Sequence, residues 1–251
     1  MLAGAGIGHL TFLDPDIVDL SNLHRQVFFT EADVGESKVK AAAHRCRALN
    51  GEITVRTRKL ALTPLNAPNL VTWSDLVIDC ADSYAASYTL SDVCLGLNTP
   101  LIRGSVLDMG GYAGGVCGDA PSLRAVFLDA PDSGASCATA GVLGPVVTLI
   151  GATQAQMALN VLLGIDPSPL GQMVQLDART LRTTTFRFDD APEPAHANAH
   201  RIAAQDLPRS LPQGSGRIAL CCATGLRAWR AAETIQTDWP GEIVLVSAST
   251  S

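Results

Sequence analysis

The feature that most restricts the fold of this chain is the alternation of short apolar segments with amphipathic ones. Four apolar segments are expected to be strands: HLTFLD (9–14), ITVRTR (53–58), DLVIDC (75–80) and PLIRGSV (100–106). The segments between them that are expected to be helices are VGESKVKAAAHRCRALN (34–50) and SYAASYTLSDVCLGLN (83–98). Strands separated by helices predict an α/β fold whose strands run parallel, with right-handed crossovers.

The second half of the chain predicts antiparallel strands added to this sheet. A long apolar segment, 141–164, contains Pro145, Gln154 and Asn160, so we expect a buried helix rather than a membrane span. QMVQLD (172–177) and TTTFRFD (183–189) are expected to follow it as antiparallel strands.

Composition excludes several classes of protein. With 47% hydrophobic and 17% charged residues, the chain is not expected to be disordered. A formal net charge of −6 argues against a general nucleic-acid binder. The seven cysteines are odd in number and irregularly spaced, which indicates reduced thiols in the cytoplasm. No secretory signal is recognisable at MLAGAGIGHL.

Charged and polar side chains follow the expected strands, where ligands bind in doubly wound sheets. Asp14 ends the first strand, SNLHRQ (21–26) lies in the loop after it, and Lys38 begins the next helix. Asp82 follows a later strand. Arg25 and Lys38 suit phosphate, and a carboxylate suits magnesium. The alternatives are a solvated lysine, a capping loop and a cap of the following helix.

Four segments together resemble one family. LDPDIVDLSNLHRQVF, DVGESKVKAA, DLVIDCADSY and SCATAGVLGPVVTLIGATQA, in this order, resemble the ThiF, MoeB and HesA group of adenylating enzymes, bacterial relatives of the ubiquitin-activating enzymes. The resemblance covers roughly residues 3–190. It implies a Rossmann-like, mostly parallel sheet with antiparallel C-terminal strands.

The resemblance also implies an activity. Such enzymes use ATP and magnesium to adenylate the C-terminal glycine of a ubiquitin-like sulfur carrier, of the ThiS or MoaD type, for thiamine or molybdopterin biosynthesis. The expected partners are that carrier, a cysteine desulfurase or other sulfur donor, and a second copy of the full-length chain. Neither nucleic acid nor a membrane is expected as a partner.

Motif matching implies the site residues. Asp14 would bind the ribose, and Asp82 would bind magnesium. Cys137 matches a cysteine on a loop above the site that some members use for thioester or persulfide chemistry. We expect this loop to follow a short strand, RAVFL (124–128). The phosphates would be held by Ser21, Asn22, Arg25 and Lys38.

Two features of the family are not matched. A glycine loop that serves Asp14 is expected about 20 residues before it, which is ahead of Met1. GAGIGH (4–9) is expected to be a turn into the strand instead. The structural zinc of the family needs two CxxC pairs. SLRA (122–125) stands in the place of the first pair and a cysteine-free stretch, 191–200, in that of the second, so no zinc is predicted.

The C-terminal segment predicts a second sulfur-competent cysteine. CATGLR (222–227) resembles the active-site loop of rhodaneses, with Cys222 at a helix N-terminus that stabilises its thiolate. Too few residues remain for a complete rhodanese domain, so this part is expected to be a small rhodanese-like α/β fragment. The expected organisation is an adenylation domain over 1–190, a linker over 191–215 and the fragment over 216–251. Cys222 is expected to react faster than three buried thiols, Cys46, Cys80 and Cys94.

Three other functions stay open. A chain without its glycine loop would be a non-catalytic protein that binds the carrier. A sulfurtransferase would act through Cys222 alone. A nicotinamide-dependent oxidoreductase would share the sheet but lacks the glycine fingerprint and leaves SNLHRQ unexplained.

Overall fold

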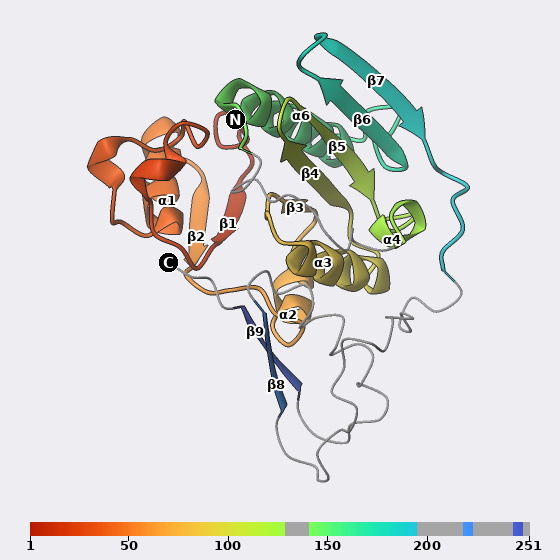
Figure 1. Cartoon of the computed structure of the whole chain (residues 1–251), viewed down its shortest axis with the longest axis horizontal. Coiled ribbons are helices and arrows are strands. Elements are labelled where there is room, and N and C mark those ends of the chain that lie inside the picture. The colour runs from red at the N-terminus through yellow and green to blue at the C-terminus, as the bar shows by residue number, and fades with distance from the viewer. Residues whose placement is uncertain (129–140, 195–217, 223–242, 248–251) are drawn as a thin grey trace.

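The structure is a computed structural model that describes residues 1–128, 141–194, 218–222 and 243–247 (Figure 1). Its first part, the N-terminal unit, consists of β1 (His9–Leu13), α1 (Lys38–Leu49) and β2 (Thr54–Arg58). The two strands are parallel, with Leu10 opposite Val55. These two apolar side chains face α1, whereas Thr11 and Arg56 are exposed on the other face of the strand pair.

A five-stranded sheet in the order β3-β4-β5-β6-β7 forms the rest of the main fold. α3 (Tyr84–Gly96) is the crossover that makes β3 and β4 parallel, and the strands that follow are antiparallel. The expected α/β class and the antiparallel C-terminal strands are confirmed. The strands are β3 (Val77–Asp79), β4 (Leu101–Leu107), β5 (Gly110–Val116), β6 (Gln172–Asp177) and β7 (Arg182–Arg187).

β5 was not expected, because its sequence, GGYAGGV, has few residues that favour strands. Its glycines are explained by close packing. A Cβ on Gly111 would lie 2.6 Å from the carbonyl oxygen of Ser105, and one on Gly115 would lie 2.5 Å from that of Pro169. Glycine is therefore needed at these positions because neighbouring backbone leaves no room for larger side chains.

Helices cover both faces of the strand β4 (Figure 1), whereas every residue of β7 is exposed. On one face, α6 (Gly144–Leu162) packs against β4 and β5 around Ile102, Ala113 and Ile150. On the other face, α2 (Ala67–Val71) and α3 enclose Leu101, Cys94 and Val116. The side chains of adjacent β4 residues, Leu101 and Ile102, thus lie in the cores on opposite faces of the sheet, because successive side chains of a strand point to opposite faces.

α6 is the one helix among the described residues that is long and apolar enough to cross a membrane. Its packing against β4 and β5 is that of a core helix. Buried positions recur along it at helical spacing, at Val146, Ile150, Gln154 and Met157. Since 33% of its apolar stretch is buried, the expectation of a buried helix holds for the face that packs on the sheet.

The N-terminal unit does not share strand pairing with the five-stranded sheet in the described structure (Figure 1). The first residues of the chain connect the two parts by packing. Ala3 is buried in the core under α1, and Leu2 packs against the core under α6. The contact between the parts is therefore made by side chains rather than by a continuous ladder of hydrogen bonds.

Two local expectations are wrong. Residues 124–128 are not a strand, because Ser122 caps a short helix, α4 (Leu123–Val126), by accepting hydrogen bonds from the backbone N–H groups of Arg124 and Ala125. Cys80 is not buried, because it comes just after β3 and is exposed. Cys46 and Cys94 are buried as expected.

In the C-terminal segment, β8 (Ile218–Cys222) and β9 (Ile243–Ser247) form a parallel pair. Cys222 is the last residue of β8. The helix expected after it lies outside the described residues.

Candidate functional site

The loop that follows β1 is shaped by its own polar side chains. Asp19 accepts hydrogen bonds from the backbone N–H of Ser21, at 2.8 Å, and from its hydroxyl, at 2.5 Å. The backbone N–H of Asp19 in turn donates to Oδ1 of Asn22, which closes a capping box around a short 3-10 helix, η1 (Leu20–Asn22). The hydrogen bonds from Ser21 hold the pKa of Asp19 below its usual value. Ser21 and Asn22 thus form the cap that was the alternative interpretation.

Arg25 lies at the end of this loop with part of its guanidinium available. Its Nη1 donates to the carbonyl oxygen of Ser21, at 3.0 Å, and contacts Nε2 of His24, at 2.9 Å. Nε and Nη2 have no hydrogen-bond partner among the described residues. The loop lies against the start of α6, because a Cβ on Gly144 would collide with the carbonyl oxygen of His24. This contact fixes the loop relative to the five-stranded sheet.

Asp16 joins two of the expected site residues. Its backbone N–H donates to Oδ1 of Asp14, at 2.8 Å, and its Oδ2 accepts from Nζ of Lys38, at 2.9 Å. The backbone N–H of Lys38 also donates to the carbonyl oxygen of Asp16. Asp14 and Lys38 are therefore held at the same end of the N-terminal unit, with Asp16 exposed to solvent between them. Sequence reasoning missed Asp16, although it lies two residues from Asp14.

A buried ion pair supports the turn that carries Asp82. Nη1 of Arg103 donates to Oδ2 of Asp79 at 2.5 Å, and both side chains are almost fully buried. The other oxygen of Asp79 accepts from the N–H of Ala81, and its carbonyl oxygen accepts from Gln154. Burial lowers the pKa of Arg103, but attraction by Asp79 and hydrogen bonding raise it further, so the guanidinium stays charged.

Asp82 itself is exposed and has no hydrogen-bond partner among the described residues. A single free carboxylate fits a magnesium ion, which commonly takes one or two carboxylates and completes its shell with water and phosphate oxygens. The expected residues fall into two groups, one in the N-terminal unit and one, Asp82, after β3. In the described structure no hydrogen bond or ion pair joins the two groups.

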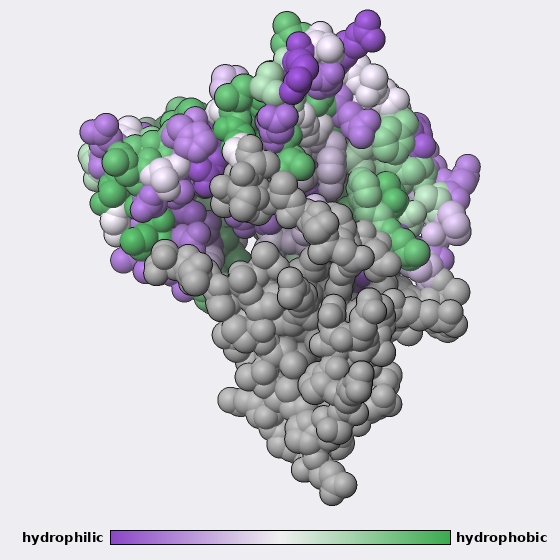
Figure 2. Space-filling view, in the orientation of Figure 1, coloured by the Kyte–Doolittle hydropathy of each residue, from purple (hydrophilic) through white to green (hydrophobic). Residues whose placement is uncertain are grey.

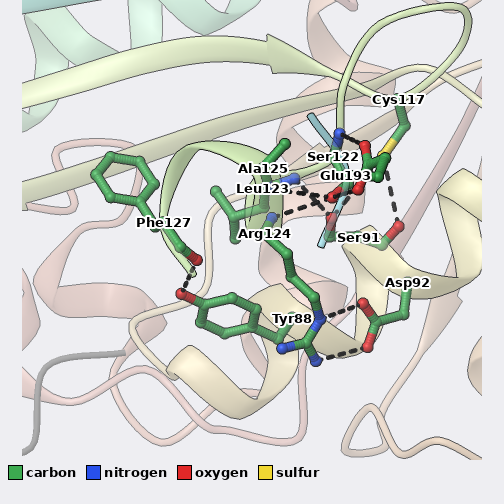
Figure 3. A network of polar contacts seen from close by, with 10 residues as sticks. All are labelled: Tyr88, Ser91, Asp92, Cys117, Ser122, Leu123, Arg124, Ala125, Phe127 and Glu193. Carbon is green, nitrogen blue, oxygen red and sulfur yellow. Dashed lines mark hydrogen bonds and ion pairs between the residues drawn. The ribbon is translucent and has the colours of Figure 1, made fainter. Parts of the chain in front are cut away.

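A partly buried polar network holds α4 against α3 (Figure 3). The carboxylate of Glu193 accepts from the backbone N–H of Ser122, at 2.5 Å, and from its hydroxyl, at 2.7 Å. Arg124 makes a two-pronged contact with Asp92, at 2.6 and 2.8 Å, and its guanidinium lies 4.6 Å from the centre of the Tyr88 ring. Glu193 thus fastens the segment after β7 to the start of α4.

This network bears on the zinc of the family. Ser122 and Ala125 stand where the first cysteine pair would be, and Ser122 is hydrogen-bonded to Glu193. The described residues contain no group of three or more His, Cys, Asp or Glu that could hold a metal ion. The described part of the chain therefore does not fit a structural zinc. His196 and His200 lie outside it, and the expectation of no zinc stays a prediction.

The two sulfur-competent cysteines cannot be placed in this site. Cys137 lies outside the described residues, and for Cys222 only its position at the end of β8 is described.

Comparison with known proteins places the chain in a family. The ThiF family model matches residues 1–197. "Adenylyltransferase and sulfurtransferase MOCS3-1" of Zea mays is 35% identical over 213 residues, which are 82% of this chain and 45% of that protein. "SAMP-activating enzyme E1" of Haloferax volcanii is 34% identical over 194 residues, 76% of this chain and 72% of that protein.

Solved structures agree on the fold. Escherichia coli MccB with MccA-N7isoASN superposes with a TM-score of 0.66 at 20% identity, covering 75% of this chain and 59% of that one. PaaA gives a TM-score of 0.62 at 22% identity, covering 74% and 58%. The α/β fold is therefore shared with these proteins. The chain belongs to the ThiF family. It spans less than half the length of the MOCS3 protein it matches.

Proposed function

We propose that this chain adenylates the C-terminal glycine of a ubiquitin-like sulfur carrier, with ATP as the second substrate. The observation that supports this most is its identity of about a third to relatives named as adenylyltransferases and as a SAMP-activating E1. The loop after β1 adds a chemical reason, because Arg25 carries N–H groups without a partner among the described residues, and the same unit holds Lys38 bound to Asp16.

In the proposed reaction, the terminal carboxylate of the carrier attacks the α-phosphorus of ATP and pyrophosphate leaves. Asp14 binds the ribose, and Arg25 and Lys38 neutralise the phosphates. Ser21 and Asn22 form the turn that positions Arg25. No general base is required, because a terminal carboxylate is ionised at neutral pH. Catalysis then rests on positioning and charge neutralisation.

Lys38 must exchange partners for this role. Its ammonium is bound to Asp16, whose side chain is 60% exposed. An exposed ion pair contributes about 0–1 kcal/mol, so transfer of Lys38 to a phosphate costs little. Asp82 would hold magnesium, which when bound supplies positive charge to the phosphates.

The wider proposal covers pathway, partners and domains. We infer a cytoplasmic protein of thiamine or molybdopterin biosynthesis that forms a homodimer and receives sulfur from a cysteine desulfurase or another donor. The division into an adenylation domain (1–190), a linker (191–215) and a rhodanese-like fragment (216–251) belongs to this proposal. Adenylation requires neither the Cys137 thiol nor the Cys222 thiol, so Cys137→Ala and Cys222→Ala should both keep pyrophosphate exchange. One or both variants should lose sulfur delivery to the carrier.

Carrier-dependent ATP–pyrophosphate exchange tests the function. Arg25→Ala and Asp82→Ala should each lower the exchange rate by at least ~100-fold, the usual effect of removing one preorganised electrostatic group. Arg56→Ala on β2 and Asp75→Ala before β3 are matched controls, because both residues are exposed charges outside the proposed site. Near-normal exchange in Arg25→Ala and Asp82→Ala would overturn the proposed roles.

A further inference from the structure

A cavity of about 190 Å³ lies beside the turn that carries Asp82, on the face of the sheet covered by α3 and α4. Its walls are mostly aromatic. The ring of Tyr112 stacks on that of Phe127, with centroids 5.6 Å apart. The hydroxyl of Tyr88 donates to the carbonyl oxygen of Phe127 (Figure 3). Its other walls are Tyr84, Arg103, Ser105 and Leu123.

The aromatic walls are rigidly supported. Arg124 lies under Tyr88, and its ion pair with Asp92 holds it there (Figure 3). Leu123, at the base of α4, is 2% exposed, and its N–H donates to Ser91. A cavity whose walls are fixed by buried contacts is preorganised for a ligand rather than a transient gap between side chains.

Three polar groups on the cavity walls remain unused. Arg103 donates through Nη1 to Asp79 and through Nε to Tyr112, whereas Nη2 has no partner among the described residues. The hydroxyls of Tyr84 and Ser105 also lack partners there. Nη2 can only donate, so a ligand that uses it must bring a hydrogen-bond acceptor.

The charge of the cavity is already balanced. Asp79 neutralises Arg103 at 2.5 Å, so an anion in the cavity would find no uncompensated cation. A cation would bring a positive charge beside a guanidinium and lose its water. A buried charge without a counter-charge is unfavourable, so the cavity favours an uncharged group.

The cavity is also close to the place where the proposed reaction occurs. Tyr84 follows Asp82 by two residues, so their Cα atoms lie within about 7 Å of each other. The carboxylate of the carrier must reach the α-phosphate near Asp82. The residues just before its terminal glycine, extended at about 3.3 Å per residue, therefore pass within reach of the cavity.

We propose that this cavity is a specificity pocket for one large uncharged side chain, aromatic and preferably tyrosine, two to four residues before the terminal glycine of the carrier. The volume fits one side chain and is too small for a nucleotide. The rings of Tyr88, Tyr112 and Phe127 contact its aromatic ring, and Nη2 of Arg103 donates to its hydroxyl oxygen. This inference rests on the proposed function, because it takes the carrier as the substrate.

The experiment uses a MoaD-type carrier ending in Gly-Gly as the probe, with Tyr, Phe, Ala, Glu or Lys placed in turn at each of the three tail positions. At one position, the KM of ATP–pyrophosphate exchange should be lowest for Tyr and Phe. It should be about tenfold higher for Ala, the scale of a lost side chain in an apolar pocket, and higher still for Glu and Lys.

The second part of the experiment uses the variant Ser105→Leu, whose larger side chain fills the cavity. This variant should raise the KM for the Tyr carrier about tenfold and leave the KM values for the Ala carrier and for ATP unchanged. Thr183→Leu is the matched control, because Thr183 is exposed on β7 of the same sheet. Tyr84→Phe removes only one hydroxyl group and is the substitute test variant if Ser105→Leu does not fold. It should reduce the preference for Tyr over Phe.

The outcomes separate the two proposals. The pocket proposal would be overturned if the KM of exchange did not depend on the tail residue. It would also be overturned if Ser105→Leu raised the KM equally for the Tyr and Ala carriers. Either result would leave the proposed adenylation activity intact. A preference for Glu or Lys would also overturn the pocket proposal. Failure of the unmodified protein to support exchange with every carrier would overturn the proposed function itself.

Discussion

The N-terminal unit and the five-stranded sheet are built from similar elements but held together differently. The core under α1 is small, with Ala3, Ala43, Cys46, Ile53 and Val55 as its buried members, and the other face of β1 and β2 is exposed. In the five-stranded sheet, helices cover both faces of β4, and the first four residues of this strand are all buried. Apolar burial is therefore much larger in the sheet.

Their polar contacts differ in the same way. The ion pair between Lys38 and Asp16 is exposed on the aspartate side, whereas Asp79 and Arg103 are enclosed. Apolar surface also appears among the polar residues of the N-terminal unit (Figure 2). Its exposed apolar side chains include Ile17, Leu20, Val27, Phe28, Val34 and Leu49. The proposed ribose and phosphate ligands Asp14, Arg25 and Lys38 thus lie on the part with the smaller core, whereas Asp82 and the proposed pocket lie on the five-stranded sheet.

The largest difference is expected for the two ion pairs. Asp79→Asn keeps the shape but leaves the charge of Arg103 buried without a counter-charge, so the free energy of unfolding should fall by about 3–5 kcal/mol. Asp16→Asn should change it by less than about 1 kcal/mol, because water replaces the lost contact. Urea unfolding of both variants measures this. Losses of equal size would contradict the contrast between buried and exposed pairs.

A smaller difference is expected within the unmodified protein. The amides of β4 (Leu101–Leu107) should exchange with solvent only on global unfolding, since packed helices cover both faces of the strand. Those of β1 (His9–Leu13) should exchange at least about tenfold faster, which corresponds to about 1.4 kcal/mol, through opening of the N-terminal unit alone. Native-state hydrogen exchange resolves the two strands. Equal protection would show that the two parts unfold together.

The contact between Glu193 and Ser122 should have an effect of about 1 kcal/mol. In Glu193→Gln one carboxylate oxygen becomes an NH₂ group that cannot accept from Ser122, so one charge-assisted hydrogen bond is lost. Glu52→Gln, at an exposed position, is the control. Thermal unfolding measures the loss, and metal analysis of both variants should find no bound zinc. Zinc at one equivalent would mean that residues beyond the described ones complete a site.

The sequence predicted the α/β class, the strands around Asp14 and Asp79, and the long helix α6, because apolar periodicity there is strong. It missed β5, whose glycines are set by neighbouring backbone that no local pattern reveals. It assigned Ser21 and Asn22 to phosphates with a capping loop as the alternative; the structure shows the capping box with Asp19, and the phosphate contacts stay a prediction. The pairing of Asp79 with Arg103 joins residues 24 positions apart and could not be derived from either strand alone.

The smallest expected effect is a dependence on pH in the N-terminal unit. A hydrogen bond from Arg45, with others from Thr30, lowers the pKa of Asp33 to about 2. The folded state therefore favours the ionised carboxylate more than the unfolded state does, and this contribution is present above the usual aspartate pKa of 3.8. It is lost as the pH falls from about 4 through about 2.

In Arg45→Met the pKa of Asp33 should return toward its usual value, so the decrease in melting temperature between pH 5 and pH 2.5 should be smaller than in the unmodified protein. Arg47→Met, on the same helix, removes a hydrogen bond to the carbonyl oxygen of Val55 rather than to a carboxylate and should leave that decrease unchanged. The same decrease in Arg45→Met as in the unmodified protein would mean that Asp33 contributes nothing to acid stability, and that its partly buried ion pair with Arg45 is energetically neutral.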